Sequence, residues 1–293
     1  MKLFSYEYNK KILPGILIED NFYDLSNSYE SVKEIIENSA TSLDNINLLI
    51  DKNDLKEIQG DIHFKSPICF PNKLMCVAGN YIDHIKEGGG DASKQKEFTQ
   101  APWLFLVPPT TVMIGHNEKV VLPKKHNSID YEGELAFVIG KGGKDITQED
   151  AHKHIFGYTI FNDVSERKPF MIEGIENPRQ LSFWYKKSFD TFGPCGPTIT
   201  TADEINNPQD LKISVKVNGE LKQECNTKHM IFDVYKLVEF VSSFLTLEPG
   251  DIISTGTPAG VGMATGIFMQ PNDTMEIDID GLGTLTNQLV EMD

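Results

Sequence analysis

The chain contains 293 residues, of which 40% are hydrophobic and 24% are charged, as in folded globular proteins and unlike disordered or fibrous ones. Its 43 acidic and 27 basic side chains give a net charge of −16, which repels nucleic acids and anionic lipids, so we predict neither a nucleic-acid nor a membrane partner. The four cysteines show no metal-binding spacing and the N-terminus has no signal-peptide pattern, which favours a reduced, cytoplasmic protein.

Residues 1–68 are predicted to form a small N-terminal α/β domain. Residues 15–20 read as a short strand, and residues 28–40 and 42–58 read as amphipathic helices because their apolar side chains recur at helical spacing. Pro67 and Pro71 then indicate a linker and turn. We therefore place a domain boundary after residue 68.

Residues 69–293 are predicted to form a β-rich α+β domain. Short strands separated by Gly, Pro and Asn are expected at 73–80, 102–108, 135–141, 154–163, 211–219, 250–256 and 274–287. Asn218-Gly219 indicates a hairpin turn. Helices are expected at 147–155, after a capping box, and at 230–247, with an apolar face from Ile231 to Phe244. The absence of a regular βαβ alternation argues against a doubly wound sheet.

The stretch from Ser128 to Lys141 has the alternation of one strand, and it places Asp130, Glu132 and Glu134 on the same face. Like charges on a partly buried face are destabilising unless protons or a cation intervene. Three interpretations stay open: a solvated face, an acid/base pair, or ligands of a hard divalent cation.

A further carboxylate comes from the apolar stretch 154–163, which ends in Asn162-Asp163. An Asp at the end of a strand is often only a turn former. Together with Glu132 and Glu134, however, Asp163 provides a third oxygen ligand from a neighbouring element. Three carboxylates and water molecules are a suitable set for Mg²⁺ or Mn²⁺.

Six segments in order resemble the fumarylacetoacetate hydrolase family, in particular its bacterial acylpyruvate hydrolase and decarboxylase-like branch. They are "PNKLMCVAGNYIDHIKE", "DYEGELAFVIGK", "FGYTIFNDVSER", "KSFDTFGPCGP", "ISTGTPAGVG" and "IDGLGTLTN", and the resemblance spans about residues 70–290. It implies a mixed β-roll or barrel domain preceded by a small, variable N-terminal domain. It also implies a homodimer.

The resemblance implies a role for several matched residues. Glu132, Glu134 and Asp163 would hold Mg²⁺ or Mn²⁺, and Asp130 would lie beside the ligands or face solvent. His84 and Glu87, three residues apart on a helical turn, would form a general base in which the carboxylate orients the imidazole. A surface ion pair is the alternative interpretation of that pair.

The remaining matched residues would bind the substrate. Lys187 aligns with the active-site lysine of the family, although the adjacent Lys186 competes for that role. Arg167 would pair with a substrate carboxylate, and Thr257 lies at a Gly-rich strand exit that can hold one. Two further residues of the first matched segment are also assigned to substrate binding: Asn80 and Tyr81.

One segment of the sequence reads as a mobile loop, and another departs from the pattern of the family. The Gly-rich residues 88–102 read as a loop that acts as a lid. After Arg167 the family commonly has Asp, whereas this chain has Lys168 and Pro169, followed by an individual insert at 171–183. These departures concern the part of the site that would meet the distal end of the substrate.

The combination predicts a metal-dependent hydrolase that cleaves a C–C bond of a small anionic 2,4-dioxo acid, an acylpyruvate, through a metal-stabilised enolate. His84 with Glu87 would activate the water molecule. The same metal site is compatible with an oxaloacetate-type decarboxylase or a 2-hydroxymuconate-type isomerase. A binding protein for oxo acids without catalytic activity is the alternative from another class.

Overall fold

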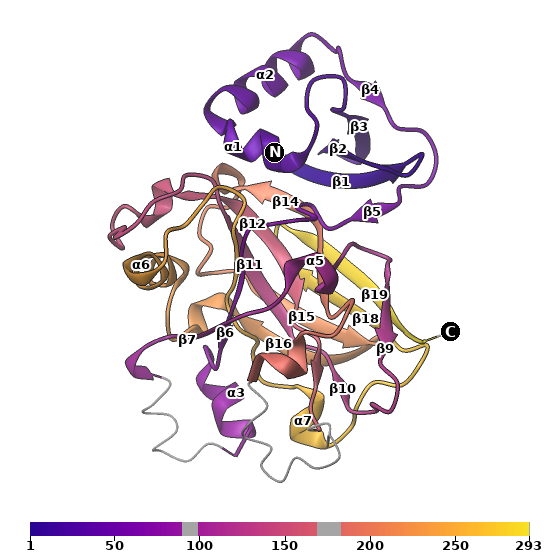
Figure 1. Ribbon diagram of the computed structural model, residues 1–293, viewed down its shortest axis with the longest axis vertical. Coiled ribbons are helices and arrows are strands. Elements are labelled where there is room, and N and C mark those ends of the chain that lie inside the picture. The colour runs from indigo at the N-terminus through magenta and orange to yellow at the C-terminus, as the bar shows by residue number, and fades with distance from the viewer. Residues whose placement is uncertain (90–98, 169–182, 293) are drawn as a thin grey trace.

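A computed structural model describes residues 1–89, 99–168 and 183–292 (Figure 1). Its helices are α1 (Val32–Glu37), α2 (Ser39–Asp51), α3 (Ile82–Glu87), α5 (Pro109–Val112), α6 (Val234–Phe244) and α7 (Gly262–Thr265). The 3-10 helices of the described ranges are η1 (Ala151–Lys153), η3 (Phe183–Lys187), η4 (Ala202–Glu204) and η5 (Thr227–His229). No helix within the described ranges has the length and apolar character needed to span a membrane.

The largest sheet connects the N-terminal residues to the rest of the chain. Its strand order is β4 (Lys56–Glu57), β3 (Asn21–Asp24), β2 (Lys11–Ile18), β1 (Lys2–Tyr8), β14 (Gly193–Thr201), β12 (Ile155–Asn162), β11 (Gly133–Ile139), β17 (Ile252–Ser254), β6 (Leu74–Ala78) and β7 (Trp103–Leu106). Two short strands lie off this path: β5 (Phe64–Lys65) beside β1 and β8 (Met113–Ile114) beside β14. Strand β1 pairs with β14, so the N-terminal residues extend the sheet of the larger part, and they lie at the top of Figure 1.

Two smaller sheets complete the strand arrangement. One contains β10 (Ile129–Asp130) and β13 (Ser165–Glu166). The other has the order β16 (Glu220–Asn226), β15 (Lys212–Val217), β18 (Thr274–Ile279), β19 (Gly283–Glu291) and β9 (Lys119–Leu122). The α+β, strand-rich prediction is therefore confirmed.

Strand β11 lies between two hydrophobic cores. Leu135, Phe137 and Ile139 belong to the core formed with the five-stranded sheet and α6, whereas Ala136 and Val138 belong to the core formed with α1, α2 and β6. Both faces of β11 are buried, which explains its continuous apolar run. Polar side chains at its beginning are consequently carried into the interior.

The predicted hairpin at Asn218-Gly219 is confirmed, since β15 and β16 pair antiparallel and both turn residues have positive φ. The predicted helix at 42–58 is too long. Helix α2 ends at Asp51 because Asn53 adopts a left-handed conformation, and Lys56–Glu57 pairs with β3 instead.

Three other predicted elements also differ from the structure. The single strand expected from Ser128 to Lys141 is interrupted at Tyr131 and Glu132, between β10 and β11. The helix expected at 147–155 is reduced to the three-residue η1. Helix α6 begins after Ile231, and Phe244 is 59% exposed because it packs on Phe240 rather than into the core.

Candidate active site

A cavity of about 460 Å³ lies at the end of β11 where its acidic residues begin. Apolar side chains from α3, β7 and α7 form part of its wall, namely Ile85, Trp103, Phe105 and Met263. The polar lining comes from residues that are distant in sequence: His84, Glu132, Glu134, Asp163, Ser165, Arg167, Lys186, Lys187 and Thr257. The cavity therefore collects most of the predicted site residues.

Glu132, Glu134 and Asp163 form a buried carboxylate cluster. One oxygen of each lies within 4.8 Å of the others, and the three residues are 4% exposed or less. The pairing of β11 with β12 brings them together, since Gly133 is opposite Asn162 and the Asp163 N–H donates to the Glu132 carbonyl at 3.0 Å. Asn162 Oδ1 also accepts from the Glu132 N–H, which fixes the interruption before β11.

A buried lysine and a largely buried arginine contact the cluster. Lys187 Nζ lies 2.5 Å from Glu132 Oε2 and 2.7 Å from Asp163 Oδ2, and it also donates to Ser165 Oγ at 2.8 Å. Arg167 pairs with the second oxygen of Glu132. Burial alone raises the pKa of Glu132, but Arg167 and Lys187 outweigh it and lower this pKa to about 2. Glu132 is therefore an anion at neutral pH.

The other two carboxylates are less well compensated. Burial and the neighbouring Asp163 and Glu132 raise the pKa of Glu134 well above its ordinary value, although Ser254 Oγ and the Gly256 N–H donate to it. Burial raises the pKa of Asp163 to about 6 despite Lys187. The nearby positive charges are therefore too few to stabilise all three carboxylates in their ionised form.

This donor set fits a divalent metal ion. Three carboxylate oxygens at mutual contact distance are hard ligands of the kind that Mg²⁺ and Mn²⁺ take. The pKa values of Glu134 and Asp163 are raised because their negative charges are buried close together, and a bound cation would neutralise those charges. Glu132, Glu134 and Asp163 are therefore the residues that would hold the ion.

His84 and Glu87 form the predicted pair on α3. His84 Nδ1 lies 2.8 Å from Glu87 Oε1, and the other oxygen of Glu87 accepts from the Gly260 N–H at 2.7 Å. Because a carboxylate only accepts, Nδ1 carries the hydrogen of a neutral imidazole and Nε2 is left as the basic nitrogen. His84 lines the cavity that contains the carboxylate cluster, and the two side chains are 15% and 16% exposed, so the pair lies at the cavity rather than on the open surface.

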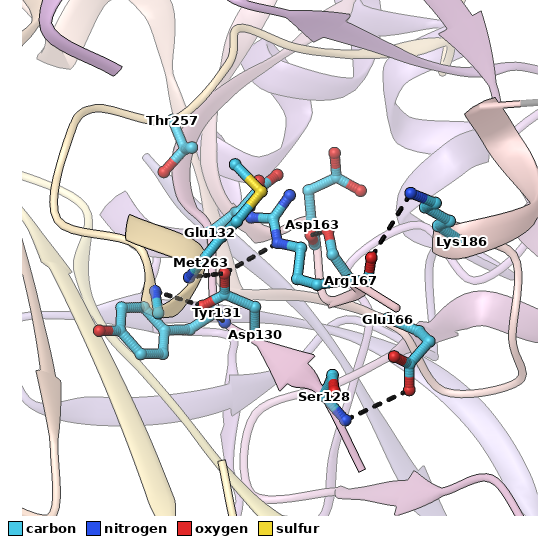
Figure 2. A network of polar contacts seen from close by, with 12 residues as sticks. Ser128, Asp130, Tyr131, Glu132, Asp163, Glu166, Arg167, Lys186, Thr257 and Met263 are labelled. Carbon is cyan, nitrogen blue, oxygen red and sulfur yellow. Dashed lines mark hydrogen bonds and ion pairs between the residues drawn. The ribbon is translucent and has the colours of Figure 1, made fainter. Parts of the chain in front are cut away.

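Asp130 does not face solvent, in contrast to one of the two positions expected for it. It is fully buried, binds Arg167 Nε at 2.8 Å and accepts from the N–H groups of Gly262 and Met263 at 2.7 and 2.9 Å. Figure 2 shows this carboxylate between Arg167 and the start of α7. Burial raises the pKa of Asp130, and Arg167 opposes the increase. Asp130 thus positions the arginine from behind the cavity.

The residues predicted to bind substrate are placed differently from one another. Arg167 lines the cavity, but Asp130 and Glu132 already hold its guanidinium. Thr257 also lines it, while its hydroxyl donates to the Gly133 carbonyl at 3.0 Å and accepts from Gln223.

Asn80 and Tyr81 are not among the described residues that line the cavity. The Asn80 side chain bonds to the backbone of Phe232 and Thr255 and so fixes the loop beside the site. Tyr81 is buried and lies against a separate, smaller hollow of about 210 Å³. Direct contact of either with a substrate stays a prediction.

Sequence reasoning missed the groups that hold the acids in place. Ser254 at the end of β17 and Ser165 in β13 bind Glu134 and Lys187, and only the strand pairing brings them there. The segment "ISTG" was a visible signal for Ser254. The lid predicted at 88–102 and the insert predicted at 171–183 fall largely on residues 90–98 and 169–182, which lie outside the described residues.

Comparison with known proteins identifies the family. The family model "Fumarylacetoacetate (FAA) hydrolase C-terminal" matches residues 73–290. The chain belongs to the fumarylacetoacetate hydrolase family. This confirms the resemblance found in the sequence and makes the protein an enzyme of that family.

Relatives within the fumarylacetoacetate hydrolase family differ in reaction. The chain is 36% identical to mitochondrial oxaloacetate tautomerase fahd2 of Xenopus laevis, over 94% of this chain and 83% of that protein. It is 41% identical to oxaloacetate tautomerase YisK of Bacillus subtilis, over 78% of this chain and 73% of that protein. Maleylpyruvate hydrolase of Sphingobium sp. SYK-6, solved with manganese(II) and pyruvate, superimposes with a TM-score of 0.82 at 27% identity over 100% of both chains.

Proposed function

We propose that this protein is a divalent-metal-dependent enzyme that interconverts the keto and enol forms of a 2-oxo acid, with oxaloacetate as the substrate to test first. The observation that carries the proposal is the placement of His84, oriented by Glu87 at 2.8 Å, in the same cavity as the carboxylate cluster. The two oxaloacetate tautomerases at 36% and 41% identity support this reaction over others of the family.

His84 supplies the proton transfer. Its Nε2 takes the proton from the carbon next to the 2-oxo group, the electron pair of that C–H bond forms the C=C bond, and the π pair of the C=O bond moves onto the 2-oxo oxygen. That oxygen then takes a proton from water, and the imidazolium of His84 releases its proton to water. The reverse sequence returns the proton to carbon. Glu87 accepts from Nδ1 of His84 and so keeps the imidazole in the required tautomer. The Gly260 N–H donates to the second oxygen of Glu87 and holds this carboxylate in place.

The cluster and its cations would stabilise the negative charge that develops on the 2-oxo oxygen. Mg²⁺ or Mn²⁺ held by Glu132, Glu134 and Asp163 would supply a Lewis acid for the carboxylate and 2-oxo oxygens of the substrate. Lys187 places a buried positive charge beside the same carboxylates. The apolar wall of Ile85, Phe105 and Met263 limits water around these charges.

Hydrolysis of a 2,4-dioxo acid, the reaction predicted from the sequence, is the second candidate. The same His84–Glu87 pair is suited to remove a proton from water, and the maleylpyruvate hydrolase structure favours this alternative. Both reactions share the oxyanion stabilisation, so the products decide between them.

The test is product identification by NMR after the protein has been stripped with a chelator and reloaded with Mg²⁺ or Mn²⁺. Oxaloacetate and acetylpyruvate are offered in parallel, and metal without protein is the control. Accelerated keto–enol exchange of oxaloacetate without net breakdown supports the proposal. Acetate and pyruvate from acetylpyruvate would establish the hydrolase instead, and CO₂ with pyruvate from oxaloacetate would establish a decarboxylase. If the metal-loaded protein converted neither compound, the alternative of a binding protein for oxo acids would be favoured.

A further inference from the structure

Two adjacent lysines at the end of η3 (Phe183–Lys187) occupy different parts of the cavity. Lys187 is 4% exposed and its ammonium is held by Glu132, Asp163 and Ser165. Lys186 cannot reach the same partners because successive side chains of a 3-10 helix are about 120° apart. Its side chain nevertheless also lines the cavity.

Lys186 differs from the other cations of the cavity in its partners. Lys187 and Arg167 are each bound by two carboxylates. Among the described residues, Lys186 Nζ has no carboxylate within ion-pair distance, and its hydrogen bond is a long one, 3.5 Å to the Arg167 carbonyl (Figure 2). Burial and the neighbouring Arg167 lower the pKa of Lys186, and the more distant Glu166 carboxylate opposes them only in part.

The charges of the site leave a place for an anion at Lys186. The carboxylate cluster and Asp130 carry up to four negative charges, and Lys187, Arg167 and a divalent ion together would carry four positive ones. The further carboxylate near Lys186, that of Glu166, is bound by His126 and by the N–H groups of Ser128 and Lys168. A substrate that brought one carboxylate and its 2-oxo oxygen to such an ion would use the charge of the ion. A second carboxylate on the same substrate therefore needs a separate cation.

Among the described residues, Lys168 is another lysine close to this part of the site in sequence. It does not belong to the described lining of the cavity, and its ammonium lies 5.8 Å over the ring of Phe268. The Lys168 side chain, which stands where the family commonly has Asp, therefore lies outside the described lining of the cavity. Lys186 is the better-placed partner.

We propose that Lys186 binds the second carboxylate of the substrate and makes the enzyme select dicarboxylic 2-oxo acids over monocarboxylic ones. This inference rests on the proposed binding of a 2-oxo acid at the cluster, but it does not depend on which reaction follows. A charge-assisted hydrogen bond in a partly buried site increases the affinity for a ligand by roughly 10- to 100-fold.

The test is a binding titration that needs no turnover. Protein loaded with Mg²⁺ is titrated by calorimetry with 2-oxoglutarate and with 2-oxopentanoate, which has the same five carbons but a methyl group in place of the second carboxylate. The wild type is expected to prefer the diacid by roughly 10-fold or more, and Lys186→Met to remove that preference while its affinity for 2-oxopentanoate stays the same. Lys186→Arg should retain the preference.

The matched control is Lys144→Met, which removes the same charge from an exposed position beyond the opposite end of β11. It should keep the diacid preference. Equal weakening of both ligands in Lys186→Met, or no preference in the wild type, would overturn the inference. A lost preference in Lys186→Met from a protein that does not enolise oxaloacetate would uphold the inference and reject the proposed reaction.

Discussion

The three carboxylates of the cluster have different charged and neutral partners. Glu132 is held by Lys187 and Arg167 and has a low pKa. Asp163 shares Lys187 with Glu132, and Glu134 is bound by the neutral donors Ser254 and Gly256, so the pKa of each of these two is raised. This asymmetry follows from position, because Glu132 lies outside the regular strand and meets both cations while Glu134 is inside β11. The cluster is therefore suited to bind a divalent ion that supplies the missing charge.

Substitution of His84 tests its role as the base. His84→Ala should lower the rate of enolisation by about 100-fold or more, since a positioned general base contributes at that level. Metal affinity should stay within a few-fold of the wild type because His84 is not a member of the cluster. Steady-state kinetics and a Mn²⁺ titration measure the two effects, and an unchanged rate would show that another group transfers the proton.

The sequence was sufficient to predict residues whose chemistry depends on local spacing. The E-x-E pattern placed Glu132 and Glu134 in the cavity, and the His84–Glu87 spacing placed His84 there, with Glu87 hydrogen-bonded to it. It was insufficient for Asp130, whose burial depends on Arg167 and on the start of α7, 132 residues further along the chain. No local pattern reports such a contact.

At the scale of elements, the short helix α7 connects the cavity wall to the buried acids. The N–H groups of Gly262 and Met263 donate to Asp130, and Met263 lines the cavity. A Cβ at Gly262 would lie 2.3 Å from the Ile267 carbonyl and 2.8 Å from Asp130 Oδ1. Backbone crowding of this kind leaves no room for a side chain.

Gly262→Ala should therefore destabilise the protein by about 1–3 kcal/mol, as overpacking does in well-packed interiors. Chemical denaturation measures the change. The control is Gly88→Ala, since a Cβ at Gly88 would have its nearest neighbours at 3.6 Å, an ordinary contact distance, and its φ is −70°. Equal stability of the two variants would contradict the packing described for α7.

Elements with a strong repeating pattern were predicted well, and those defined by distant partners were not. The core of α6 and the β15–β16 hairpin follow from local sequence. Strands β1 and β14 went unpredicted, although their pairing joins residues 1–68 to the large sheet. A separate domain at 1–68, a homodimer and a cytoplasmic location stay predictions.

At the scale of the whole molecule, the buried acids couple stability to pH and to metal. A carboxyl whose folded pKa is raised makes the folded state bind more protons than the unfolded chain, so its contribution to stability is lost as pH rises. For Asp163 this loss falls between about pH 4 and pH 6, and for Glu134 it continues at higher pH. Glu132 acts in the opposite sense, but its change lies below about pH 4.5 and is complete at pH 5.

The expected result is that Mg²⁺ raises the melting temperature more at pH 8 than at pH 5, because protons compete with the ion for the same oxygens. At a concentration about 100 times the Kd the increase at pH 8 should be about 5 °C. Differential scanning fluorimetry with and without chelator measures it. Glu134→Gln is the control and should show little increase at either pH. A shift that is independent of pH would place the ion elsewhere.

The most direct test of the account is the rate at which the enol absorbance of oxaloacetate decays in the presence of the protein. Chelator-stripped protein should be inactive, and Mg²⁺ or Mn²⁺ should restore a rate well above that of the metal alone, with loss of this gain in Glu134→Gln. A protein-dependent rate that survives complete metal removal, or a fully loaded protein that leaves the metal-only rate unchanged, would contradict the proposal that the carboxylate cluster and His84 enolise 2-oxo acids.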